Sequence, residues 1–523
     1  MSTTNPAADD HTVKSFVRAP LAVAALTLLG FLVRLRGIGQ SLGGDELLSW
    51  FGTWHQPLSI VVQRSPEYRD PNPPLFFLLA KASESLGDAT VSIRLPSLIA
   101  GTLLVPLVWA LGRRIANERA ALAGAALTAV NLTAVFYSNE ARPYELLAFL
   151  GALNAFVLLK ALDSRKTTWW LAWALTAAAV MYTHYTGLFV VLAGFVWACW
   201  TNRDQIKSLF GWAALAGLMF VPWIPSIGLS GTAYSSGKFV VSTVLAERLL
   251  RMFIANPFDD PPLLDVPGAG PLILFAVAVA GALLALTAEK LRSGSKGTDS
   301  SLIEATTTTA STFTNAAPVT RLVREPVLLG LLAIASPVGM LVTSALTGSG
   351  FLLTRYLSPS FAALILVLAA VLTAPRGRLG VALACAAVAA SAWGCVVVAN
   401  QTHERPDMRA AAAWIDRELP VKTVVADNFL GWDGQRPLAP YLKDPARTPR
   451  KQWNFPGAGV WFAQAVAERT GIAIAFTDCP AFRALNTVPP LLVNDFRIER
   501  EAVFPGGSCG IRVRYLKNRS EPK

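Results

Sequence analysis

The chain has 523 residues, of which 53% are hydrophobic and 15% charged, and its mean hydropathy is +0.44. Soluble proteins carry about 25% charged residues, so this composition excludes a mostly soluble chain. The net charge of +12 is interpreted first as cytoplasmic lysine and arginine of a membrane protein, and not as a nucleic-acid surface. The five cysteines form neither a CxxC pair nor a zinc-type spacing.

Residues 1–19 are expected to form a cytoplasmic tail. The first span, from about Leu21 to Ile38, is expected to stay as an anchor, because no small-residue cleavage site follows it. Stretches without acidic or basic side chains predict the other spans, and the long stretch 167–202 divides at Thr183-His-Tyr-Thr-Gly187. These stretches run 95–112, 120–139, 146–159, 167–202, 208–237, 266–288, 326–354, 356–375 and 379–403. The prediction is an α-helical polytopic membrane protein with about 11 transmembrane helices in residues 20–400.

The first outer loop, residues 39–93, is expected to hold interfacial helices. Residues 73–87 begin apolar but then carry Lys81 and Glu84, which favours a helix lying in the membrane interface over a span. With this arrangement 17 lysines and arginines face the cytoplasm and 11 face outside, as the positive-inside rule requires. If residues 73–87 crossed the membrane, every later basic cluster would lie on the opposite side from the one that the rule requires.

The later part of the chain predicts a cytoplasmic linker and an outer domain. Residues 289–325 are expected to form the linker, with a flexible Ser- and Thr-rich stretch at 293–320. Residues 401–523 contain strand-like runs at 422–426 and 471–476 and an amphipathic helix at 409–419. They predict a small extracytoplasmic α/β domain. Its Cys479 and Cys509 form either a disulfide or two buried free thiols.

Several polar clusters converge on the outer face under this topology. An acid that accepts a proton, flanked by arginines that hold a phosphate, suits group transfer from a lipid phosphate. The candidate catalytic residues are Asp45 and Glu46, in Gly44-Asp-Glu-Leu-Leu-Ser49. The candidate donor-phosphate and substrate residues are Arg142, Glu140, Arg355, Tyr356, Asp70, Asn72, Lys81, Arg94 and His184. No metal-ligating set is predicted.

Each candidate also has a structural interpretation. Asp45 and Glu46 suit the start of a juxtamembrane helix, because acids stabilise helix N-termini. Glu140 and Arg142 could pair at a helix end, and His184 could be a satisfied turn histidine. The remaining basic candidates, Arg355, Arg94 and Lys81, are also typical of interface anchors. Their conjunction on one side of the membrane is what favours a site.

Two absences restrict the chemistry. The sequence has no GxxxxGK[ST] loop, so this chain carries no ATP-driven pump core. It has no GxGxxG unit between a strand and a helix, which argues against a Rossmann-type nucleotide-sugar site. A donor that is already bound to the membrane fits these absences better.

The chain resembles the polytopic GT-C glycosyltransferases, and most of all the bacterial branch related to protein mannosyltransferases and the aminoarabinose transferase of lipid A. The similarity covers roughly residues 20–375. The matching segments are Gly44-Asp45-Glu46, Asn72-Pro-Pro-Leu-Phe-Phe-Leu-Leu79, Gly87-Asp-Ala-Thr-Val-Ser-Ile-Arg94-Leu-Pro-Ser97, Ser138-Asn-Glu-Ala-Arg-Pro-Tyr144, Thr183-His-Tyr-Thr-Gly187 and Arg355-Tyr-Leu357.

The resemblance implies transfer of a sugar from a polyprenyl-phosphate carrier to a glycan, lipid or protein on the outer face of the cytoplasmic membrane, usually with inversion. The enzyme would be a hexosyl- or pentosyltransferase of mannosyltransferase-like type, with Asp45 as catalytic base and Glu140 and Arg142 nearby. Asn72 departs from many relatives, which have His or Lys there. The sugar, the acceptor, the isoprenoid length and a need for a divalent metal stay open.

Two other functions compete with a transferase. A transporter or flippase of lipid-linked glycans would place charges near the bilayer midplane and show inverted repeats, whereas the acids here cluster at the outer interface and no repeat is visible. A non-catalytic assembly or scaffold protein that keeps the fold is the third alternative. A transfer assay with a lipid-linked donor separates the three.

Overall fold

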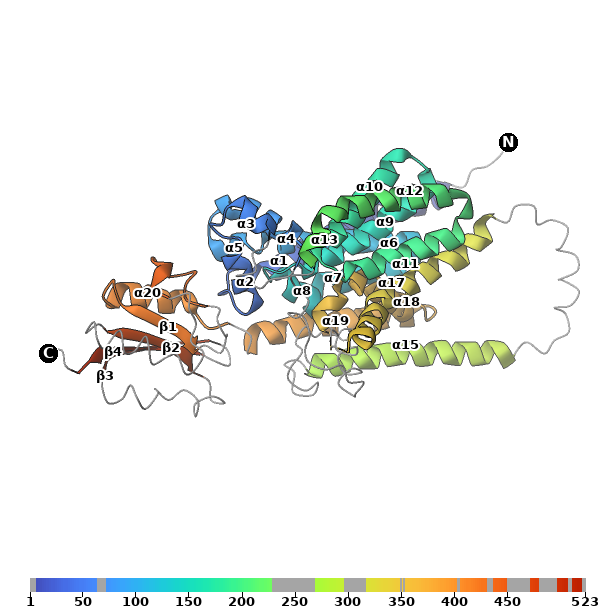
Figure 1. Ribbon diagram of the computed structural model, residues 1–523. Coiled ribbons are helices and arrows are strands. Elements are labelled where there is room, and N and C mark those ends of the chain that lie inside the picture. Colours follow the sequence, from blue (N-terminus) through green and yellow to red (C-terminus); the bar gives the residue numbers. More distant parts are fainter. Residues whose placement is uncertain are drawn as a thin grey trace, which may run out of the picture.

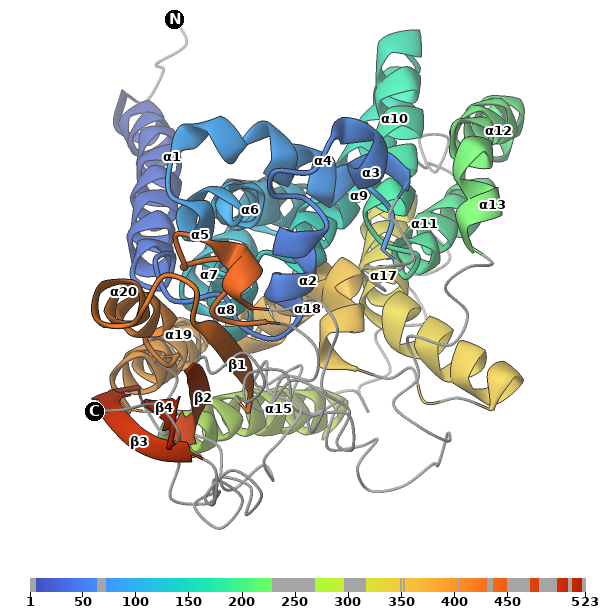
Figure 2. The same cartoon turned by 60° about the vertical axis from the view of Figure 1, so that its left-hand side comes forward.

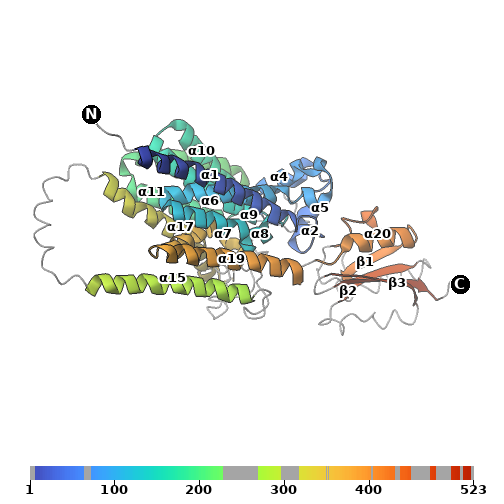
Figure 3. The ribbon, with the colours of Figure 1, turned by 180° about the vertical axis from the view of Figure 1, so that it is seen from behind.

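The computed structural model describes residues 6–63, 72–227, 269–295, 317–348, 350, 353–401, 405–429, 436–448, 471–478, 496–506 and 510–519. The described residues form a long helical bundle with a small sheet domain at one end (Figure 1). Helix α19, Arg378–Gln401, leads from the bundle toward that domain (Figure 3).

Within the described residues, every predicted span coincides with a helix or with consecutive helices. Among the described residues, seven helices are long and apolar enough to cross a membrane, or eight if a pair bent by 52° counts as one span. The other segments are shorter. The helices are α1 (Pro6–Leu35), α6 (Leu95–Ile115), α7 (Glu118–Val130) bent into α8 (Leu132–Ser138), α9 (Tyr144–Ser164), α10 (Thr167–Thr183), α11 (Gly187–Thr201), α12 (Ile206–Phe220), α15 (Ala269–Ser295), α17 (Ala317–Thr347), η7 (Thr354–Ser360) continuing into α18 (Phe361–Thr373), and α19.

Helix α9 lies at the centre of the bundle, and 78% of its apolar 18-residue stretch is buried. Helix α15 runs along one edge, and only 17% of its apolar stretch is buried (Figure 1). Small residues allow close approach at the centre. A Cβ on Gly112 of α6 would lie 2.7 Å from Leu366 of α18 and 2.9 Å from the backbone of Ala121 in α7. Such close contacts stabilise helices in a membrane, where burial of apolar surface adds little.

The segment predicted as the first outer loop holds short helices in its described residues: α2 (Asp45–Phe51), α3 (Leu58–Gln63), α4 (Leu75–Ala82), η2 (Glu84–Leu86) and α5 (Ala89–Ser92). Helix α4 covers most of the apolar part of 73–87 and spans eight residues, or about 12 Å, so it cannot cross a bilayer. Phe76, Phe77 and Ala80 bury one side of it in a core shared with α2.

The predicted linker is shorter than expected. Residues 289–295 continue α15, and residues 317–325 already belong to α17, because both flanks contain helix-forming residues next to apolar spans. The stretch 296–316 lies outside the described residues.

The C-terminal domain is a four-stranded sheet with one helix packed on it, which agrees with the predicted α/β class. Its strands are β1 (Val424–Phe429), β2 (Ile472–Asp478), β3 (Phe496–Phe504) and β4 (Gly510–Asn518), in the order β1-β2-β4-β3. The β1–β2 pair is parallel, with Val424 opposite Ile472, and the other pairs are antiparallel. Helix α20, Met408–Glu418, buries Met408, Ala411, Ala412 and Ile415 against the sheet. That spacing is the amphipathic period predicted for 409–419.

Candidate active site

Four segments bring polar side chains together at the end of the bundle that meets the C-terminal domain. They are the first turn of α2, the turn 139–143 between α8 and α9, the turn after α10, and η7. Gly44 precedes α2 with φ of 52°, a left-handed conformation that glycine adopts at little cost. The turn at Gly44 places Asp45 at the start of the helix.

Asp45 meets both predicted arginines. Arg355 Nη1 donates to Asp45 Oδ2 at 3.1 Å, although the two residues are 310 positions apart. Arg142 Nη1 donates to the Asp45 carbonyl oxygen at 3.3 Å and to Ser49 Oγ at 3.2 Å. The Asp45 side chain is 36% exposed, which leaves it open to a substrate. The structure therefore places a partly exposed carboxylate beside Arg355, with Arg142 bonded to the backbone of the same residue.

Three rings lie beneath these arginines and form an aromatic floor, made of Tyr144, His184 and Tyr356. The Arg355 guanidinium carbon lies 5.5 Å from the Tyr356 ring and 6.0 Å from the Tyr144 ring. The Arg142 guanidinium carbon lies 5.9 Å from the Tyr144 ring. The rings of His184 and Tyr356 are 5.2 Å apart. Contacts of this kind hold a guanidinium group in place while it keeps its charge.

His184 is buried in the turn after α10. The backbone N–H of Thr186 donates to His184 Nδ1 at 3.2 Å, and Thr186 Oγ1 lies 2.9 Å from the same nitrogen. The turn therefore orients the imidazole ring, as the structural interpretation of this histidine expects. The same ring also belongs to the aromatic floor, so His184 lies at the site.

Glu46 has a different environment from its neighbour. It is fully buried, and its carboxylate accepts from Arg94 Nε and Nη2, both at 2.7 Å, from the Ala141 N–H at 2.7 Å, from the Gly43 N–H at 3.3 Å and from Arg405. Burial favours the neutral acid, but the combined attraction of Arg405 and Arg94 lowers the pKa of Glu46 below its usual range. The oxygens of Glu46 are thus occupied by the protein, which favours a structural role, while its predicted role in catalysis beside Asp45 stays a prediction.

Arg94, a predicted phosphate-binding residue, is also engaged by the protein. Beyond its two bonds to Glu46, it donates to the carbonyl oxygens of Ile38 at 2.8 Å, Gln40 at 2.5 Å and Ser41 at 3.2 Å. An arginine has five N–H donors, so all of them are taken. A phosphate contact from Arg94 would require breaking this buried pair.

Glu140 forms an ion pair with Arg405, a partner that the sequence interpretation did not consider. Burial raises the pKa of Glu140 above its usual range, Arg405 opposes that effect, and the nearby Glu46 and Asp45 add to it. Sequence reasoning missed Arg405. A basic residue directly after the last span, on the same side as the acids, was the available signal.

Two of the remaining candidates lie in or just before α4, and the third lies outside the described residues. Lys81 pairs with Glu84, whose carboxylate also accepts from the His55 N–H at 2.7 Å. Asn72 is fully buried just before α4. Asp70 lies outside the described residues, as do Glu67, Cys479 and Cys509.

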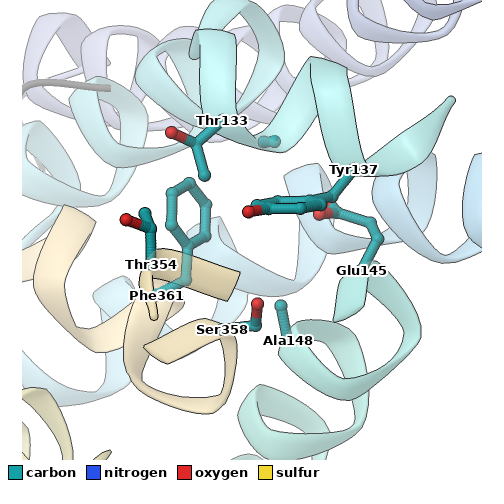
Figure 4. Close-up of a pocket in the computed structure, with 8 residues that line it drawn as sticks. Thr133, Tyr137, Glu145, Ala148, Thr354, Ser358 and Phe361 are labelled. Atoms are coloured by element: carbon teal, nitrogen blue, oxygen red, sulfur yellow. The ribbon is translucent and has the colours of Figure 1, made fainter. Parts of the chain in front are cut away.

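A small pocket lies within the bundle, between α8, α9 and η7. It is lined by Thr133, Tyr137, Glu145, Thr354 and Ser358, with Phe361 closing one side (Figure 4). Thr354 directly precedes Arg355 in the chain, and Glu145 directly follows Tyr144. The pocket therefore adjoins the aromatic floor. Sequence reasoning missed Glu145, which sits one residue inside a span.

The described residues contain no group of three or more His, Cys, Asp or Glu side chains that could hold a metal ion. The donors gathered around Asp45 are mainly guanidinium groups, which bind anions. The described part of the site therefore suits a phosphate and a proton acceptor.

Comparison with known proteins identifies one matching family model and several solved structures of similar fold. Residues 71–227 match the family model of dolichyl-phosphate-mannose-protein mannosyltransferases. No curated protein matches the sequence.

Among solved structures, ArnT from Cupriavidus metallidurans bound to undecaprenyl phosphate is similar, with a TM-score of 0.57 and 12% identity over 96% of this chain and 99% of that one. Its apo form gives the same score and identity over 98% of this chain and 100% of that one. The chain is thus a polytopic membrane protein with the fold of ArnT, and its residues 71–227 match the model of the dolichyl-phosphate-mannose-protein mannosyltransferase family.

Proposed function

We propose that the protein transfers a sugar from a polyprenyl-phosphate-linked donor to a glycan, lipid or protein acceptor at the outer face of the cytoplasmic membrane. The observation that carries this proposal is the exposed Asp45 carboxylate 3.1 Å from Arg355, with Arg142 bonded to the same turn. A structure of the same fold contains undecaprenyl phosphate, which supports a lipid phosphate as the donor's leaving group.

The reaction follows from this placement. An acceptor hydroxyl attacks the anomeric carbon of the sugar and passes its proton to Asp45. The bond between that carbon and the phosphate oxygen breaks, and the polyprenyl phosphate leaves with the electron pair. Arg142 and Arg355 stabilise the charge that develops on the phosphate. A single displacement of this kind inverts the configuration of the anomeric carbon.

The orientation of the site is part of the proposal. Helices α6 and α9 both begin at the site, so Arg113, Arg114 and Arg165 lie at their opposite ends. An excess of basic residues marks the cytoplasmic side, which supports a site on the outer face. There the donor keeps its tail in the bilayer and presents its phosphate at the level of Arg142 and Arg355.

The test is transfer by the purified protein in lipid nanodiscs, with a panel of radiolabelled polyprenyl-phosphate sugars and cell-envelope fractions as acceptors. We expect one donor to lose its label to an acceptor, and Asp45→Asn to abolish that transfer. Movement of the donor between leaflets without covalent transfer would instead support the flippase alternative. Neither transfer nor movement, from a folded protein, would support a scaffold.

A further inference from the structure

The C-terminal domain docks onto the first outer loop, close to the candidate base (Figure 2). Arg409 Nη1 donates to Asp88 Oδ2 at 2.6 Å, and the Arg436 guanidinium carbon lies 4.3 Å from the Phe51 ring at the end of α2. The Leu42 N–H donates to Tyr441 Oη at 2.5 Å. Neither the transfer chemistry nor the membrane anchoring explains why this domain reaches the catalytic turn.

Arg405, at the start of the domain, joins two acids of the membrane part. Its Nη1 donates to Glu46 and to the Ser41 carbonyl oxygen, the latter at 3.0 Å, and its Nη2 donates to Glu140. The Arg405 side chain is 20% exposed, Glu46 is fully buried and Glu140 is 11% exposed. One planar guanidinium therefore bridges two carboxylates that are 94 positions apart in the chain.

Both acids flank residues of the site. Glu46 follows Asp45 directly, and Glu140 lies two positions before Arg142. The Ala141 N–H also donates to Glu46, at 2.7 Å, so the turn before α9 is tied to the first turn of α2 on both sides. The bridge made by Arg405 spans the same two turns that carry the base and a phosphate-binding arginine.

The charges of the bridge balance. Glu46 and Glu140 oppose Arg94 and Arg405, and Arg94 is already satisfied by Glu46 and three carbonyl groups. Removing Arg405 would leave Glu140 buried without its cation, next to Glu46. Like charges in a buried site repel, so the two turns would separate or one acid would take up a proton.

We propose that Arg405 is a positioning residue that sets the separation of Asp45 and Arg142. Through this residue, the C-terminal domain contributes to the geometry of the active site. The inference rests on the proposed function, because it assigns Asp45 and Arg142 to the reaction. It assigns the C-terminal domain a role in turnover that neither the family match nor the shared fold supplies.

The experiment compares Arg405→Lys with Arg409→Lys, in the full chain in nanodiscs. Lysine keeps the charge, but its single ammonium group cannot bridge two carboxylates in a fixed plane. We expect Arg405→Lys to lower turnover at saturating donor about 10-fold or more and to weaken binding of undecaprenyl phosphate about threefold or more. Arg409→Lys changes a half-exposed arginine of the same interface and should stay near wild type.

A rescue separates positioning from general damage. Arg405→Gln alone should lose more activity than Arg405→Lys, and adding Glu140→Gln should recover at least fivefold, because two neutral amides can bond without an unpaired buried charge. Wild-type turnover by a folded Arg405→Lys variant would overturn the proposal, and so would an equal loss in Arg409→Lys or no recovery in the double variant.

The phosphate-binding measurement keeps this test separate from the proposed function. If the wild type transfers no sugar from any donor but binds undecaprenyl phosphate, the proposed function fails alone. Binding that then weakens in Arg405→Lys and not in Arg409→Lys still supports the bridge, and equal binding in both variants overturns it.

Discussion

Asp45 and Glu46 are neighbours with the same chemistry, so replacing each by its amide makes a matched pair of perturbations. Asp45→Asn keeps the shape of the side chain and removes its ability to accept a proton. The Asp45 and Arg355 side chains are each about a third exposed, 36% and 33%, and ion pairs in such places contribute about 0–1 kcal/mol. We therefore expect this variant to fold normally and to lose turnover about 100-fold or more.

Glu46→Gln should behave in the opposite way. The Glu46 carboxylate accepts from five N–H donors, which come from Arg94, Arg405, Ala141 and Gly43. An amide has one oxygen, and its NH₂ group would face donors instead of acceptors. Leaving buried arginines without their partner costs about 3–5 kcal/mol, so we expect a clear loss of stability.

Thermal unfolding in detergent, followed by tryptophan fluorescence, measures stability in both variants, and the transfer assay measures turnover. A Glu46→Gln variant as stable as Asp45→Asn would refute the assignment of Glu46 to structure. Wild-type turnover by Asp45→Asn would refute the assignment of Asp45 as base, whatever its stability.

Three further predictions follow from other parts of the molecule. Replacing Arg142 or Arg355 by Lys should raise the apparent Michaelis constant for the donor, and Ala should do so more strongly; unchanged constants for both Ala variants would place the phosphate elsewhere. Burial raises the pKa of Asp427 to about 7, against the hydrogen bond from the Leu438 N–H. The folded state then holds this proton more tightly than the unfolded state, so the C-terminal domain should lose up to about 4 kcal/mol of stability between pH 4 and pH 7. Hydrogen exchange of β1 and β2 in the full chain should show that loss in the wild type and not in Asp427→Asn. Cysteines introduced within 296–316 should be protected from an impermeant thiol reagent in intact cells, and cysteines near residue 440 should be labelled; the reverse pattern would place the site inside.

Most of the helical architecture could be predicted from the sequence, because a membrane span is a local property. About 17–25 apolar residues without charge suffice to specify one, and each predicted stretch coincides with a helix. The same holds for α20, where apolar residues at helical spacing face the sheet. Only the ends differed, as at 289–295 and 317–325, since charged helix-forming residues can extend a helix beyond its apolar part.

The residues around Asp45 could be predicted only as candidates on one membrane face. Their type and side of the membrane follow from sequence, but the partner of each charge depends on segments far apart in the chain. Asp45 and Glu46 are equivalent in the sequence, yet only the Glu46 carboxylate is buried and accepts hydrogen bonds from arginines and backbone N–H groups. The partners of Arg405 could not be predicted for the same reason: its two acids come from turns more than 260 residues earlier. Local sequence therefore specifies the helices and the kinds of charge near Asp45, whereas the fold specifies which acid stays accessible, because burial and long-range pairing set the role of an ionisable group.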